Sequence, residues 1–244
     1  EALEPDPGLD PDFEFSDGVI TGYNGTATEV VIPAEIGNGK VTEIGNKAFQ
    51  NKGLTSVEFP NTLEKIGTQA FAKNNLTSVV FPDTLEEIGQ QAFAQNSLTS
   101  VDFPDSVKII GVGSFLNNSI SEMSFKQGLR EIRDNAFTKS LIKEVTIPGS
   151  VKQIGMRAFS NCGQLEKVDI QEGVEYIGKY AFEKGVLTSV VIPDSVIDID
   201  DGAFWNNYIS EVELGDGLEK IGNQAFVNNQ IQSITIPNGL KTLA

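Results

Sequence analysis

The sequence predicts a repeat solenoid of the α/β class, with parallel strands on a concave face and short helical or irregular segments on the convex face. The first observation is a phenylalanine that recurs every 22 residues, with a single step of 23. The second is a short alternating apolar pattern, and the third is a proline that follows this pattern in most units. The phenylalanines of the column are Phe49, Phe71, Phe93, Phe115, Phe137, Phe159, Phe182, Phe204 and Phe226.

A unit of this length cannot bury an apolar face by itself, because its surface is too large for its volume. Stacked copies can bury it, since each unit covers the open side of its neighbour. Further apolar columns keep step with the phenylalanines, and Ile66, Leu76 and Val79 represent them in one unit. The sequence therefore predicts a continuous apolar column along the molecule.

Three regions are expected along the chain. Residues 1–12 are acidic and contain prolines, which predicts a linker or tail. Residues 13–26 predict an N-terminal β-hairpin cap, because Asp17-Gly18 is a favoured hairpin turn. Residues 27–244 then hold an array of about nine to ten coils. No Ala-Phe pair follows Leu243, so we expect the array to be truncated at its C-terminus.

The segment "LTSVVFP" predicts a strand. Val79 and Phe81 point inward and Ser78 and Val80 outward, because successive side chains of a strand alternate. Pro82 ends the strand, since proline cannot donate to a ladder. Equal strands in successive coils are expected to form one parallel ladder.

The segment "PDTLEEIGQQAF" follows each predicted strand. Asp83 with Glu86 three residues later is typical of the start of a helical turn, and "QQAF" predicts another short helical turn. The pattern "TLEEI" does not distinguish a helical turn from a short second strand. The fold prediction therefore includes helical segments on the convex face, with this choice left open.

The unit as a whole reads L-x-x-V-x-[FI]-P followed by L-x-x-I-G-x-x-A-F-x-x-[NC]. In these residues the chain from Ala27 to Leu243 resembles the leucine-rich repeats of BspA-like bacterial proteins. The resemblance implies an extracellular or cell-surface protein, with the export signal absent from this sequence. It also implies a non-enzymatic binding or adhesion module for a protein or glycan, host matrix included. A structural spacer stalk for another domain is the alternative.

The composition excludes several function classes. The formal net charge of -16 repels phosphate backbones and anionic lipid surfaces, so nucleic acid is not an expected partner. No apolar run is long enough to span a membrane. With no histidine and one cysteine, the chain lacks the usual general base and any cysteine-based zinc site. We expect no cofactor.

Function on a solenoid is carried by outward positions that vary between coils. We predict a ligand-binding surface on the concave face, where Val80 and Val191 are notable because they are apolar and outward. Their strand propensity alone is the simpler explanation. The residues of the predicted surface are Glu58, Val80, Asp102, Glu122, Glu144, Asp169, Val191 and Glu213.

Asp198, Asp200 and Asp201 form the densest carboxylate cluster of the array. Carboxylates bind cations through oxygen, and a pair of them can cleave a glycosidic bond. A solvated turn explains the cluster more simply. It is therefore a weak candidate for a metal site, and a carboxylate-dependent carbohydrate-active enzyme is the less favoured function.

Two more columns lie at the bend after each phenylalanine. The first is asparagine in several coils and Cys162 in one, which predicts a residue that bonds backbone groups of the bend, with a reactive thiol as the alternative for Cys162. The second is a patch of large side chains, interpreted either as a contact surface or as packing between coils. Its residues are Leu116, Leu141, Val186, Trp205 and Tyr208.

Overall fold

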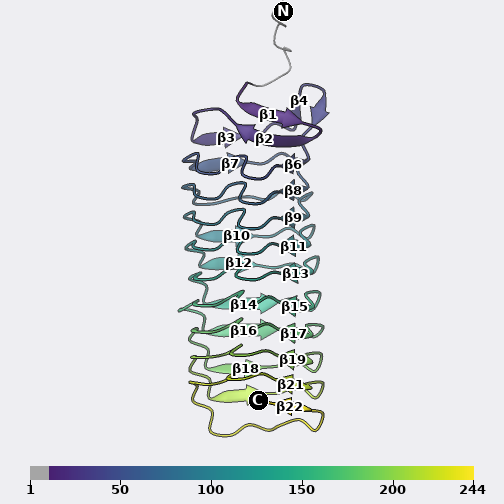
Figure 1. The fold of residues 1–244 in the computed structure, drawn as a ribbon, viewed down its shortest axis with the longest axis vertical. Coiled ribbons are helices and arrows are strands. Elements are labelled where there is room, and N and C mark those ends of the chain that lie inside the picture. Colours follow the sequence, from purple (N-terminus) through teal and green to yellow (C-terminus); the bar gives the residue numbers. More distant parts are fainter. Residues whose placement is uncertain (1–10) are drawn as a thin grey trace, which may run out of the picture.

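The computed structural model describes residues 11–244, so the first ten residues of the predicted acidic tail lie outside the described residues. The chain winds into an elongated stack of coils, with the N-terminal hairpin at one end (Figure 1). In this view the stack is close to straight. The predicted concave and convex faces are not distinct in this view, so the two strand-bearing sides are named by their strands.

One side carries a sheet of twelve strands, which we call the ladder side. It begins with an antiparallel pair and continues in parallel. In order, its strands are β1 (Phe13–Ser16), β2 (Val19–Tyr23), β6 (Glu43–Ile44), β8 (Lys65–Ile66), β9 (Glu87–Ile88), β11 (Ile109–Ile110), β13 (Glu131–Ile132), β15 (Gln153–Ile154), β17 (Tyr176–Ile177), β19 (Asp198–Ile199), β21 (Lys220–Ile221) and β22 (Thr242–Leu243).

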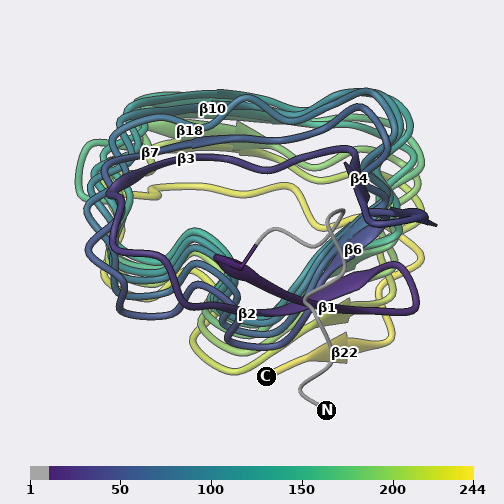
Figure 2. The ribbon, with the colours of Figure 1, turned by 90° about the horizontal axis from the view of Figure 1, so that it is seen from above.

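The other side carries parallel strands that are bonded only in twos, and we call it the strand-pair side. The pairs are β3 (Glu29–Val31) with β7 (Ser56–Glu58), β10 (Ser100–Asp102) with β12 (Glu122–Ser124), β14 (Glu144–Ile147) with β16 (Lys167–Ile170), and β18 (Ser189–Val191) with β20 (Glu211–Glu213). A small antiparallel pair, β4 (Glu35–Ile36) with β5 (Gly39–Lys40), lies near the hairpin. Seen along the stack, β3, β7, β10 and β18 lie on one side and β6 and β22 on the other (Figure 2).

The expected unbroken ladder is therefore built by a different segment from the one predicted. The "TLEEI" segment, left open between helix and strand, supplies β9, which pairs with β8 and β11. The "LTSVVFP" segment does not form a continuous ladder, and Ser78–Phe81 is in no strand at all.

A wider spacing of the rings accompanies the interruption at Ser78–Phe81. Phe59, Phe81 and Phe103 stack beneath the strand-pair side with centroids 6.1 and 5.9 Å apart, wider than the roughly 4.8 Å between bonded strands. Phe103 and Phe125 are closer, at 5.5 Å, and there β10 does pair with β12.

The helical segments predicted for the convex face are wrong: residues 11–244 contain no helix. Gln69 and Lys73, two residues before and after Phe71, have φ of 56° and 60°, and most coils repeat this left-handed pair. A right-handed helical turn needs negative φ, so it cannot pass through these positions. The N–H groups of Gln69, Phe71 and Lys73 instead donate to the next coil, with N···O distances of 2.8–2.9 Å. No helix of the described residues is therefore available to cross a membrane.

The predicted phenylalanine column is confirmed. The rings from Phe49 to Phe204 are fully buried, and Phe226 is partly buried. Neighbouring rings lie nearly parallel, as for Phe115 and Phe137, whose centroids are 5.4 Å apart at an angle of 2°. Each buried ring contributes about 1.5–3 kcal/mol by transfer out of water.

The N-terminal hairpin covers the first end of this column. Asp17 and Gly18 form its turn, both with positive φ. β2 pairs in parallel with β6 and so begins the ladder. The Tyr23 ring stacks on Phe49 with centroids 5.2 Å apart, which covers the outermost ring of the repeats.

Candidate functional site

All eight residues of the predicted binding surface are exposed on the strand-pair side. The two valines are the notable ones, because Val80 is 82% and Val191 57% exposed. The inward neighbours Val79 and Val190 are buried, so the predicted alternation is correct at both positions. The structure places the eight residues along one side of the stack and does not gather them at one point.

Two open hollows adjoin Val80. One, of about 570 Å³, lies between Ser56–Phe59 and Ser78–Asp83. The other, of about 460 Å³, lies between Ser78–Val80 and the pair β10–β12. Both occur where Ser78–Phe81 makes no ladder with its neighbours, so the gap between the strands leaves Val80 between two hollows.

The acidic side chains of this side are partly compensated. Glu122 and Glu144 belong to different sheets, and Glu144 lies in register with Lys167. Asp102 accepts a hydrogen bond from Ser124 and has the Lys126 ammonium 3.7 Å away. Lysines of neighbouring coils thus lie close to some of these carboxylates.

The aspartate cluster lies on the ladder side, and lysines of neighbouring coils engage two of its members. Asp198 accepts from Lys220 at 3.0 Å, and Asp201 accepts from Lys179 at 2.9 Å. The Lys179 hydrogen bond, followed by the backbone N–H of Asn223, lowers the pKa of the Asp201 carboxyl. The acid of a glycosidase needs a raised pKa instead.

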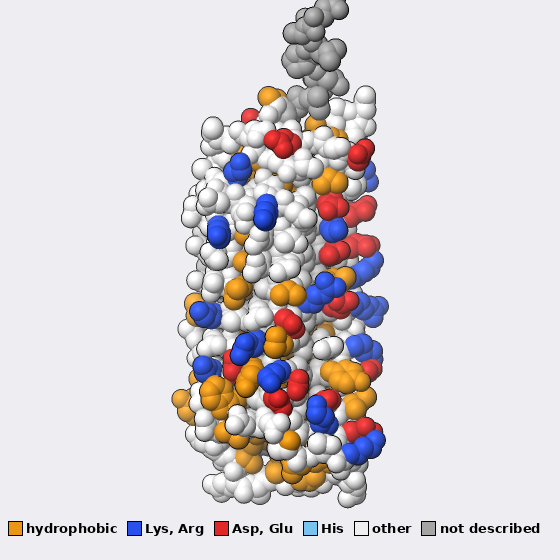
Figure 3. Space-filling model, in the orientation of Figure 1, with side chains coloured by type: hydrophobic (Ala, Val, Ile, Leu, Met, Phe, Trp, Pro, Cys, Tyr) orange, Lys and Arg blue, Asp and Glu red, His pale blue; other side chains and the backbone are white. Residues whose placement is uncertain are grey.

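Among residues 11–244, no group of three His, Cys, Asp or Glu side chains is arranged to hold a metal ion. The cluster belongs to a longer column of ion pairs between coils, visible as alternating red and blue side chains along one edge (Figure 3). These pairs are Glu43–Lys65, Glu86–Lys108, Lys152–Glu175, Lys179–Asp201, Asp198–Lys220 and Glu219–Lys241.

The asparagine column bonds the backbone of two coils at once. Asn118 accepts from the Leu98 N–H at 3.0 Å and donates to the carbonyls of Phe93 and Phe115 at 2.9 and 3.0 Å. Cys162 keeps one of these bonds, because its thiol donates to the Phe137 carbonyl at 3.4 Å. Burial raises the pKa of Cys162 to about 12, which favours the structural interpretation over a reactive thiol.

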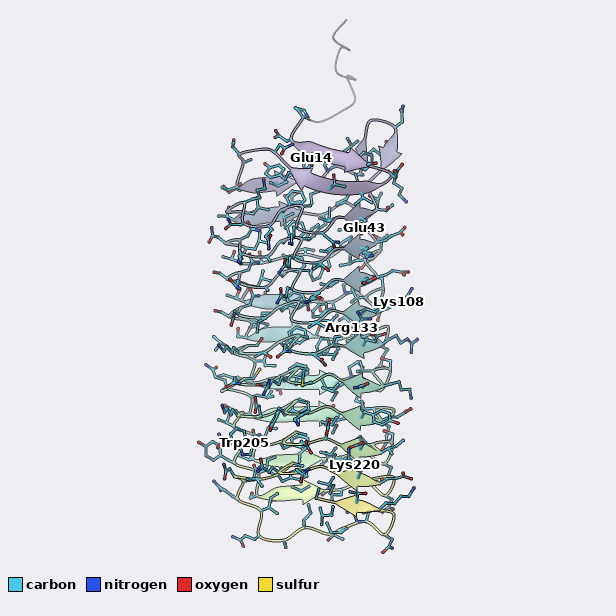
Figure 4. All side chains as sticks on the ribbon, in the orientation of Figure 1. Glu14, Glu43, Lys108, Arg133, Trp205 and Lys220 are labelled. Atoms are coloured by element: carbon cyan, nitrogen blue, oxygen red, sulfur yellow. The ribbon has the colours of Figure 1, made fainter. Side chains whose placement is uncertain are left out.

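The predicted patch of large side chains divides in two. Leu116, Val186 and Trp205 are half-buried, whereas Leu141 and Tyr208 are 40% and 54% exposed. Trp205 lies at the edge of the molecule opposite the one that carries Lys108 and Lys220 (Figure 4).

Sequence reasoning missed two neighbours of Trp205. The Tyr180 ring meets it edge-on at 6.4 Å, and the Lys184 ammonium lies 5.4 Å from its centre. A signal was present, since the single tryptophan and three of the four tyrosines fall between residues 176 and 208.

Solved structures share the fold. A leucine rich cell surface protein from Faecalibacterium prausnitzii A2-165 is 24% identical, with a TM-score of 0.55, over 96% of this chain and 84% of that one. The pneumococcal vaccine antigen PcpA is 25% identical, with a TM-score of 0.64, over 91% of this chain and 64% of that one. The chain thus spans less than two thirds of the PcpA structure. Curated proteins gave no match.

The repeat itself matches a known family. The family profile described as a BspA type leucine rich repeat region matches residues 42–166 and 130–244, with six copies. These matches span most of the described coils and confirm the resemblance seen in the repeat residues. The chain belongs to the BspA-type leucine-rich repeat family.

Proposed function

We propose that the chain is a non-enzymatic binding module of a bacterial cell-surface or secreted protein, and that it engages a protein or glycan through the strand-pair side. The observation that carries the proposal is Val80, which is 82% exposed between two open hollows. Covering an apolar side chain with this exposure removes apolar surface from water, which favours binding of a partner.

The surroundings of Val80 have the composition of an interface. Glu58, Asp83 and Asp102 line the two hollows, so carboxylates surround an apolar centre. Interfaces commonly combine an apolar core with a polar rim. The site is also rigid before binding, because the twelve-stranded sheet fixes the coils, and rigidity lowers the entropy lost on association.

Family membership supports the surface location and the binding role, because the resemblance to BspA-like proteins implies both. A carbohydrate-active enzyme is not favoured, since lysines engage Asp198 and Asp201. A structural spacer is the second candidate, and the ladder that runs from β1 to β22 favours it.

The proposal is tested by binding to immobilised host matrix proteins and to a glycan array. The test variant is Val80→Lys/Val191→Lys. The control is Leu141→Lys/Met156→Lys, which changes the charge equally at exposed apolar residues outside the strand-pair side. We expect the test variant to bind about tenfold more weakly and the control to match the wild type.

Equal binding by both variants would contradict a role for the strand-pair side. If the wild type binds none of these ligands, the spacer becomes the better explanation. Circular dichroism of each variant checks that the fold is retained, which we expect because the substituted positions are exposed.

A further inference from the structure

We propose a second binding site, for a neutral saccharide, at the bend of the coils between Lys184 and Gln230. A hollow of about 260 Å³ opens there, beside the Tyr208 ring. The site goes beyond the proposed function, because it uses none of the residues of the predicted surface on the strand-pair side.

Glycine stands in the asparagine column where the chain lines this hollow. Gly185 stands where Asn74 and Asn96 stand in earlier coils. A Cβ at Gly185 would lie 2.7 Å from the Asn207 side-chain oxygen, which accepts a hydrogen bond from the Leu187 N–H at 3.2 Å. Glycine at this position therefore allows Asn207 to keep its place in the wall of the hollow.

Tyr208 supplies an aromatic wall to this space. It is 54% exposed, and Val186 of the preceding coil lines the same hollow. At the equivalent position the earlier coils have Asn75 and Ser97, so the ring is a local feature. A pyranose ring has an apolar C–H face that can cover such a ring, with hydroxyl groups around its rim.

Three side-chain amides surround the wall. Asn206, Asn228 and Gln230 line the hollow, and their side chains make no hydrogen bond to the described residues. The neighbouring amides of Asn207 and Asn229 are already bonded to the backbone. Each free amide offers both a donor and an acceptor, which is what adjacent hydroxyl groups need.

The charges favour a neutral ligand. Lys184, the cation beside the hollow, is held over the Trp205 ring, and Arg157 is held over Tyr180 at 5.1 Å. The formal net charge of -16 repels sialylated and sulfated glycans. The volume is close to the lower end of the range for small ligands, about 300–1,000 Å³, which suits one or two sugar rings better than a protein surface.

Trp205 can report on binding, because it is the single tryptophan of the chain and contacts Lys184, which lines the hollow. The probes are neutral tetrasaccharides of glucose, mannose and N-acetylglucosamine, with sialylated and sulfated oligosaccharides for comparison. We expect at least one neutral probe to change the fluorescence of Trp205 saturably, and the anionic probes to leave it unchanged.

Variants then locate the site. Tyr208→Ala should weaken binding about tenfold, and Gln230→Ala should also weaken it, whereas Tyr208→Phe keeps the ring and should stay within about threefold. Leu141→Ala is the matched control, because Leu141 is an exposed residue at the same position of an earlier coil.

Binding that is insensitive to Tyr208→Ala, or a response to anionic probes alone, would overturn the proposal. So would the absence of any saturable response to the neutral probes. Val80→Lys/Val191→Lys should leave the fluorescence response intact. The two sites can therefore fail independently.

Discussion

Two regions of the stack use the same repeat differently. In the coils of residues 54–129, which we call the regular coils, the asparagine column holds Asn74, Asn96 and Asn118, and a second column of rings lies beside the first. In the coils of residues 130–209, the variable coils, the first three of these positions are Ser140, Cys162 and Gly185, and asparagine returns at Asn207. The second ring column is replaced there by Ile147, Ile170 and Ile192.

The variable coils, whose repeat is less regular, expose more large apolar side chains than the regular coils do. Within residues 54–129, which the structure describes in full, Val80 is the one large apolar residue that is exposed. The variable coils expose several, namely Leu141, Met156, Tyr176, Val191 and Tyr208. The comparison teaches that the regular coils repeat their stabilising contacts most strictly, whereas relaxed repeat positions in the variable coils coincide with more exposed apolar side chains.

The largest expected loss of stability comes from changing one of two equivalent phenylalanines. Phe93 meets the rings of Phe59 and Phe81 edge-on, besides its stacked neighbours, whereas Phe182 has only Phe159 and Phe204 as ring contacts among the described residues. We expect each change to alanine to lower the free energy of unfolding by about 3–5 kcal/mol. The loss should be larger for Phe93→Ala by about 1–3 kcal/mol, since each edge contact adds about 0.5–1.5 kcal/mol.

Urea denaturation of both variants measures this difference. Equal losses would remove the second ring column as a distinction between the two regions.

The next test compares the asparagine column. Asn118→Ala leaves the Leu98 N–H and two carbonyls without their partner, which should cost about 1–3 kcal/mol. Ser140→Ala should be close to neutral, because the buried Ser140 hydroxyl has no hydrogen-bond partner. Urea denaturation of both variants measures these losses. A Ser140→Ala variant that loses as much free energy of unfolding as Asn118→Ala would show that the variable coils also depend on this position.

The comparison also predicts a substitution that raises the stability of the fold. Ser140→Asn should restore the column in a variable coil and raise the free energy of unfolding by about 1 kcal/mol, the net worth of a typical hydrogen bond. The midpoint of urea unfolding checks it, with Ser119→Asn at an exposed neighbouring position as the control. A destabilised Ser140→Asn would mean that this bend differs in shape from that of the regular coils.

The smallest effect concerns pH. The lowered pKa of Asp201 gives stability that is present above its ordinary value of 3.8 and lost as the pH falls through the folded value. The pKa of Lys179 is raised, chiefly by its hydrogen bond to Asp201. The stability that Lys179 contributes is therefore lost only as the pH rises above 10.5 and through the folded value. Lys179→Met should therefore lower the urea midpoint slightly near pH 7 and not at about pH 2.

Lys73→Met is the matched control for this effect, because Lys73 is an exposed lysine with no ion pair to the described residues. A loss that persists at about pH 2 would assign the effect to packing of the Lys179 stem.

Much of the core could be predicted because burial repeats with the sequence. The spacing from Phe71 to Phe93 places like rings on one another, and the alternation around Val80 gives the correct outward side chains. The left-handed residues could not be predicted, because Gln69 and Lys73 are ordinary residues whose φ is fixed by bonds to the next coil. The local cue of Asp83 and Glu86 was misleading for a different reason, because the Glu86 N–H donates to the Glu64 carbonyl of the preceding coil and β9 begins at Glu87.

The sites were only partly predictable. Exposure of Val80 follows from alternation, but the hollows beside it are lined by residues of neighbouring coils, whose spacing a single unit does not reveal. Tyr208 was included in the predicted patch, whereas the roles of Lys184 and Gly185 depend on contacts between coils, which a single unit does not reveal.

The direction of the hydrogen bonds at the bends has a consequence for biosynthesis. Phe71 donates forward to Ala92, and Phe93 donates forward to Ser114, while ladder residues such as Gly89 donate backward to Ile66. A coil leaving the ribosome can dock at once on the coil before it, but its forward donors wait for the coil that has not yet been made. Folding during translation should therefore proceed from the hairpin onward and trail the growing chain by about one repeat.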